Sequence, residues 1–66
     1  MYTILKGKLD LVGLDSNAYS ILSAVKRALR KAGNPPKVID AVLADMKSGD
    51  YDHLLAVATD VVEAEE

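Results

Sequence analysis

The chain has 66 residues, a formal net charge of −2 and a hydrophobic content of 50%. A chain of this length forms one small domain of marginal stability, and it is too apolar to stay disordered. It contains no cysteine, which excludes disulfides and thiolate metal sites. No hydrophobic run approaches the ~20 residues of a membrane span, and the first residues lack a signal-peptide pattern. We therefore expect a cytoplasmic protein without a membrane segment.

Residues 2–12 are predicted to form one extended strand. Leucines and charged residues alternate on its two faces: Leu5, Leu9 and Leu11 on one, Lys6, Lys8 and Asp10 on the other. The alternative is a short hairpin that turns at Lys6-Gly7. Lys-Gly is a weaker hairpin turn than Asn-Gly, so the single strand is favoured.

A single strand needs a partner for its backbone amides and carbonyls. Three partners are possible: the same strand of a second copy, the other arm of the hairpin, or a second strand at residues 61–63. Pairing between two copies also adds buried area to a small core, so we expect a homodimer.

Three amphipathic helices are predicted after the strand, over about 17–32, 35–47 and 51–63. Asp15, Ser16 or Asn17 can cap the first helix, and Gly33 can end it. The expected apolar faces are, in helix order, Ala18, Ile21, Leu22, Val25, Ala28, Leu29 and Ala32; Val38, Ile39, Val42, Leu43 and Met46; and Tyr51, Leu54, Leu55, Ala58, Val61 and Val62. The predicted fold is a single α+β domain over residues 1–66, mainly α, with one N-terminal strand or hairpin.

Residues 48–55 hold the chain's only histidine beside two carboxylates. Asp50 and His53 could form a base and its orienting partner, or two metal ligands. However, Asp52 is rotated by about 100° from His53 on a helix, and no second histidine is present to complete a metal site. We favour a helix cap, in which Asp50 is the N-cap and His53 bonds back toward it. We expect no catalytic residue, no metal and no cofactor.

Charge is distributed unevenly along the chain. Residues 1–38 carry seven basic and two acidic residues, whereas residues 39–66 carry one basic and eight acidic residues. The first helix presents four cations, Lys26, Arg27, Arg30 and Lys31. They could meet phosphates, but the third helix carries only acidic charges and could not serve as a DNA-recognition helix. Separated charge can orient a protein partner.

Three segments resemble motifs of a family of short uncharacterised bacterial and phage proteins with no known activity. They are Leu-Val-Gly at residues 11–13, Asp-Ser-Asn-Ala-Tyr at 15–19, and Ser-Gly-Asp-Tyr-Asp-His-Leu-Leu at 48–55. Ser16 stands where the family has glycine. The resemblance spans about residues 4–62 and implies a natural small domain without assigning it an activity.

These patterns favour a non-enzymatic protein–protein interaction module, an adaptor or modulator. The alternative is a nucleic-acid-associated protein that uses the basic face of the first helix. The candidate interaction surface comprises Lys26, Arg27, Arg30, Lys31, Tyr51, Asp52 and His53.

Overall fold

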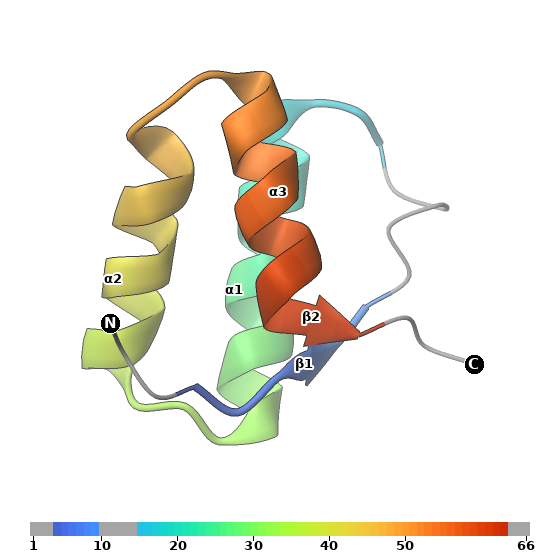
Figure 1. Cartoon of the computed structure of the whole chain (residues 1–66). Helices are drawn as coiled ribbons and strands as arrows, with labels where there is room; N and C mark the ends of the chain where they lie inside the picture. Colours follow the sequence, from blue (N-terminus) through green and yellow to red (C-terminus); the bar gives the residue numbers. More distant parts are fainter. Residues whose placement is uncertain (1–3, 10–14, 64–66) are drawn as a thin grey trace.

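Three helices and a two-stranded parallel sheet make up the fold (Figure 1). The computed structural model describes residues 4–9 and 15–63. Its elements are, in chain order, β1 (Gly7–Lys8), α1 (Ala18–Ala32), α2 (Pro36–Lys47), α3 (Tyr51–Val61) and β2 (Val62–Glu63). The prediction of a mainly helical α+β fold is confirmed.

The strand near the N-terminus pairs with the end of the same chain. β1 and β2 are parallel, with Gly7 opposite Val62 and Lys8 opposite Glu63, and the Leu9 amide donates to the Glu63 carbonyl over 2.9 Å. This is the third of the three predicted pairings. Gly7 lies within β1, so the hairpin turn at Lys6-Gly7 is absent. Residues 2, 3 and 10–12 of the predicted strand lie outside the described residues.

The third helix is shorter than predicted. We expected it to reach residue 63, but α3 ends at Val61 because Val62 is extended, with φ −127° and ψ 154°. The two residues that follow the helix form β2 instead. The acidic end of the predicted helix is therefore the second strand of the sheet.

Local capping groups set the ends of α1. The Asn17 side chain accepts the Tyr19 amide over 2.8 Å, so Asn17 is the N-cap among the three predicted candidates. At the other end Gly33 has φ 103°. The Gly33 amide donates to the Arg30 carbonyl, and the Asn34 amide donates to the Leu29 carbonyl. These two bonds form a Schellman motif, which favours glycine because a side chain is strained at such a φ.

The second and third helices also begin at local signals in the sequence. Pro36 occupies the first turn of α2, where its missing amide hydrogen costs nothing. The side chain of Asp50 accepts the His53 amide over 2.9 Å and caps α3. The predicted N-cap role of Asp50 is confirmed.

The helices meet in one hydrophobic core. Its buried members are Ile21, Val25, Ala28, Leu29, Ile39, Val42, Met46, Leu54, Val57, Ala58, Val61 and Val62. Two expectations for the apolar face of α3 need correction. Val57, which the predicted face omitted, is buried because α3 packs against both other helices and β2. Tyr51, which the face included, keeps 42% of its surface exposed.

The sheet is held against α1 by a close approach and a buried amide. A Cβ on Gly7 would lie 2.8 Å from the carbonyl carbon of Ala28, so the strand sits closer to the helix than any side chain allows. Asn34, between α1 and α2, is buried and bonds the backbone of Leu5. Among the described residues, no helix is long and apolar enough to cross a membrane.

Candidate interaction surfaces

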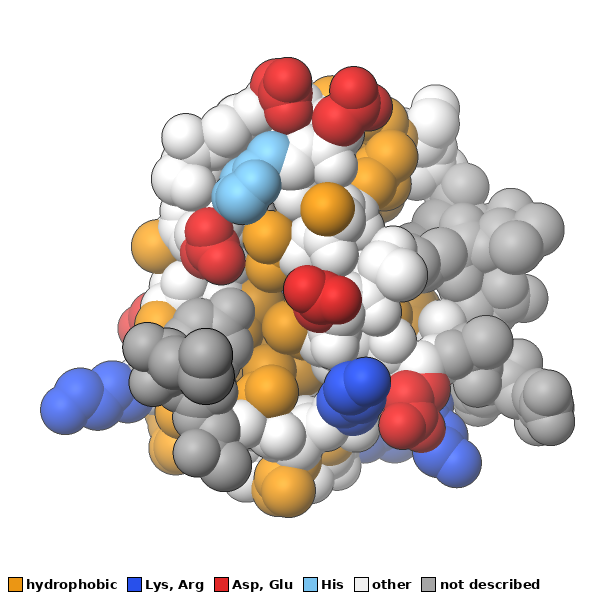
Figure 2. Space-filling view, viewed as in Figure 1, with side chains coloured by type: hydrophobic (Ala, Val, Ile, Leu, Met, Phe, Trp, Pro, Cys, Tyr) orange, Lys and Arg blue, Asp and Glu red, His pale blue; other side chains and the backbone are white. Residues whose placement is uncertain are grey.

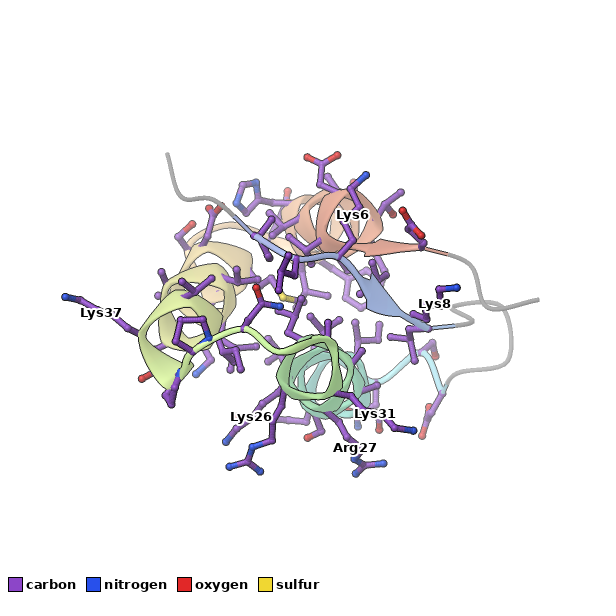
Figure 3. All side chains as sticks on the ribbon, turned by 90° about the horizontal axis from the view of Figure 1, so that it is seen from below. Lys6, Lys8, Lys26, Arg27, Lys31 and Lys37 are labelled. Carbon is purple, nitrogen blue, oxygen red and sulfur yellow. The ribbon has the colours of Figure 1, made fainter. Side chains whose placement is uncertain are left out.

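The four predicted cations form a basic face on α1. Lys26, Arg27, Arg30 and Lys31 are exposed, and Figure 3 shows Lys26, Arg27 and Lys31 projecting away from α2 and α3. Within residues 4–9 and 15–63, no carboxylate lies within 4.0 Å of a lysine or arginine nitrogen. No described carboxylate therefore neutralises the positive charge of the basic face.

β1 adds a lysine that sequence reasoning did not assign to this surface. Lys8, Arg27 and Lys31 line a shallow groove of about 210 Å³ whose floor includes Leu9 and Ala28. β1 packs on the C-terminal half of α1, with Gly7 against Ala28, so Lys8 comes near cations that are about twenty residues away in sequence. The alternation of charged residues had marked Lys8 as outward-facing, but only the packing of β1 on α1 places it beside Arg27.

The remaining predicted surface residues lie at the other end of α1. Tyr51 donates its hydroxyl proton to the Ser16 carbonyl over 2.6 Å, just before α1 begins, whereas Arg30 and Lys31 are in its last turn. The helix between these ends rises about 20 Å at 1.5 Å per residue. Figure 1 shows α3 beginning where α1 begins. The last-turn cations Arg30 and Lys31 therefore lie at the opposite end of α1 from Tyr51, whereas Lys26 and Arg27 lie midway along the helix.

His53 joins α2 to α3. Its Nε2 lies 3.0 Å from the carbonyl oxygen of Asp45 and 3.1 Å from the Asp45 Oδ1. Both partners are acceptors, so Nε2 carries a proton and donates. The prediction that His53 bonds toward its N-cap holds for its backbone amide, but the imidazole turns to Asp45 in the last turn of α2. Asp50 is thus not the orienting partner of His53.

Most of the segment 48–55 has a structural role. Ser48 donates its hydroxyl proton to the Asp45 carbonyl over 2.6 Å. A Cβ on Gly49 would lie 2.8 Å from the Cβ and Cγ of His53, so glycine makes room for the imidazole. Asp50 caps α3 and Leu54 is buried. Asp52 and the exposed side of the Tyr51 ring are left for binding.

In the part of the chain that the structure describes, no group of three His, Cys, Asp or Glu residues is placed to hold a metal ion. Asp52 is exposed on the first turn of α3, and the histidine is committed to Asp45.

A second groove opens between the starts of α1 and α3 and the end of α2, and we call it the tyrosine groove. It has a volume of about 390 Å³, and Tyr19 and Tyr51 line it together with Leu22 and Leu54. Tyr19 is 80% exposed. Sequence reasoning did not select Tyr19, although an aromatic residue on the polar face of an amphipathic helix is a signal that could have identified it.

The two surfaces differ in charge. Figure 2 shows acidic side chains over the end of the molecule where α3 begins and also further along this face, whereas cationic side chains lie only near the opposite end. On this face the cations are thus confined to the half opposite the start of α3, where acidic side chains lie as well.

Comparison with protein-family models, with curated proteins and with solved structures found no significant match to this chain. The resemblance to short bacterial and phage proteins therefore stays a prediction.

Proposed function

We propose that this protein is a non-catalytic interaction module that docks an acidic segment of a partner protein on the basic face of α1. One observation carries the proposal. Four exposed cations share one helix face, and among the described residues none of them forms an ion pair with a carboxylate. Carboxylates of a partner would find these cations free, and complementary charge speeds and orients association.

The arrangement of charge supports a specific surface rather than general attraction. The net charge is −2, so the molecule as a whole does not attract anions. A partner that carries negative charge is drawn to the basic face and repelled from the acidic end near α3. This polarity would fix the orientation of the complex.

A capture experiment with two matched variants tests the proposal. Lys26→Glu/Arg27→Glu reverses the basic face, and Lys6→Glu/Lys37→Glu makes the same change in net charge elsewhere. Figure 3 shows Lys6 and Lys37 away from the outer face of α1. The wild type and both variants would be immobilised and exposed to a nuclease-treated lysate of cells that make the protein, and captured proteins would be quantified by mass spectrometry.

We expect an acidic protein that the wild type and the Lys6/Lys37 variant retain equally. The Lys26→Glu/Arg27→Glu variant should capture at least tenfold less of this protein than the wild type does. Equal loss from both variants would mean that only net charge matters, and the proposal would be wrong. Equal retention by all three proteins would place any contact elsewhere.

The second candidate function is nucleic-acid binding through the same face. The groove lined by Lys8, Arg27 and Lys31 favours it, because three cations from two elements can follow a phosphate backbone.

Fluorescence anisotropy with a labelled DNA oligonucleotide at several salt concentrations tests this candidate. Affinity should fall steeply with salt, and Lys8→Ala should lower the slope of log K against log salt by about 0.7–0.9. Affinity that does not depend on salt would eliminate it.

A further inference from the structure

The tyrosine groove combines a protruding ring with a hollow on one patch of surface. Tyr19 is 80% exposed on the first turn of α1, and its hydroxyl bonds no other described residue. Beside it the groove of about 390 Å³ has apolar walls that include Ala18, Leu22 and Leu54. A large aromatic ring and a neighbouring apolar hollow are the features that anchor protein interfaces.

We propose that the tyrosine groove binds the tyrosine groove of a second copy of this chain, in a dimer with two-fold symmetry. In such a contact both copies use the same patch, so every protrusion or charge on the patch needs a complementary feature elsewhere on that patch. Tyr19 of each copy enters the hollow of the other. The two copies therefore form two identical contacts.

The charges that line the groove meet the same requirement. Lys47 and Asp50 lie on it together, and no ion pair joins them within 4.0 Å. Across a two-fold axis, Lys47 of one copy can face Asp50 of the other. Because the patch carries one charge of each sign, the patches of two copies can meet without net repulsion between these groups.

The second tyrosine gives the groove a fixed wall. The Tyr51 hydroxyl is tied to the Ser16 carbonyl at 2.6 Å, so its ring position is set before any contact forms. A preorganised side chain loses little conformational entropy on binding. Tyrosine supplies a large contact area at low entropic cost, and this favours Tyr51 as a wall for an incoming ring.

The pairing of β1 leaves the groove as the better dimer contact. β1 already bonds β2 within one chain, so a second copy is not needed to supply that partner. A standard interface buries about 800 Å² on each partner, and the chain has an accessible surface of 4619 Å². A contact of that size would cover about a sixth of that surface.

The test is the molar mass in solution, measured by light scattering after size exclusion over a range of concentrations. We expect the wild type to shift with concentration from 7.1 kDa toward twice that mass. Tyr19→Ser should stay at the monomer mass at every concentration, whereas Tyr19→Phe should behave as the wild type. Because Tyr19 is exposed, circular dichroism of both variants should show an unchanged fold.

The matched control is Leu5→Ser, which removes another exposed large hydrophobic side chain, 57% exposed beside β1. It should dimerise like the wild type. Three results would overturn the proposal: a wild type that is monomeric at all concentrations, a dimer that survives Tyr19→Ser, or a dimer lost in Leu5→Ser alone. The last result would move the contact to the N-terminal strand, and a monomeric wild type would leave the groove for a different occupant.

Salt separates this contact from the one on the basic face. Burial of tyrosine rings is an apolar effect, and exposed pairs such as Lys47 and Asp50 contribute little, so the dimer should weaken only slightly as the salt concentration rises. Docking of an acidic segment on the basic face should weaken. Dissociation of the dimer by moderate salt would overturn the proposal without affecting the proposed function.

Discussion

Asn34 and Leu5 form a closed pair of hydrogen bonds between segments that are 29 residues apart. The Leu5 amide donates to Asn34 Oδ1 over 2.8 Å, and Asn34 Nδ2 donates to the Leu5 carbonyl over 2.7 Å. The same Nδ2 also donates to the Leu29 carbonyl over 2.9 Å, at the end of α1. One amide thereby satisfies the backbone of the chain entering β1 and ties it to α1.

Asn34→Ala should lower the free energy of unfolding by about 1–3 kcal/mol, because it leaves buried backbone groups without partners. Asn34→Asp should be at least as damaging, since a carboxylate cannot donate to the two carbonyls. Urea denaturation measures both effects, and hydrogen exchange at the Leu5 amide should accelerate in each variant. An Asn34→Ala protein as stable as the wild type would show that the pair contributes nothing.

Two glycines should respond differently to substitution. Gly7→Ala should cost about 1–3 kcal/mol, because the new Cβ meets the backbone of Ala28 at 2.8 Å and either β1 or α1 must shift. A Cβ at position 33 would contact only the Leu5 side chain, at 3.7 Å. Gly33→Ala should still lower the free energy of unfolding by about 1–2 kcal/mol, because alanine is strained at a φ of 103°.

Asparagine distinguishes these two causes. Gly33→Asn should lose less stability than Gly33→Ala, because asparagine tolerates positive φ better than alanine does. Gly7→Asn should lose at least as much as Gly7→Ala. Thermal denaturation of the four variants gives the comparison, and equal losses at Gly33 for alanine and asparagine would contradict the conformational explanation.

Features set by neighbouring residues could be predicted from the sequence. The N-caps Asn17 and Asp50 and the C-cap Gly33 act within a few residues of their own positions, so the positions of the helices followed from local signals. The periodic apolar residues of α1 and α2 likewise identified their buried faces. For this reason the fold class and most of the core were predictable.

Contacts between distant segments could not be predicted in the same way. Asn34 lies between α1 and α2 in the sequence, but its side chain bonds the backbone of Leu5, 29 residues away. Lys8 joins the basic face only because β1 packs on α1. The imidazole of His53 bonds Asp45 rather than Asp50, and this partner depends on how the α2–α3 turn folds. Residue spacing carries no information about such partners.

Asp50→Ala should cost about 0.5–2 kcal/mol, because the His53 amide loses its partner and the first turn of α3 loses a carboxylate near its positive end. Asp50→Asn should retain most of the stability, since an amide oxygen can accept the same bond. Chemical denaturation gives both values. Equal losses in the two variants would show that charge, and not the cap bond, is the cause.

His53→Ala should lower the free energy of unfolding by about 0.5–1.5 kcal/mol, because it removes the Nε2 bond to the Asp45 carbonyl. His53→Gln keeps an N–H donor and should recover part of this loss. Zinc titration by calorimetry should give the same weak or absent binding for the wild type and His53→Ala, since the imidazole is occupied by Asp45. Zinc binding that disappears in His53→Ala would instead assign His53 a ligand role, and the structural role proposed for residues 48–55 would then be incomplete.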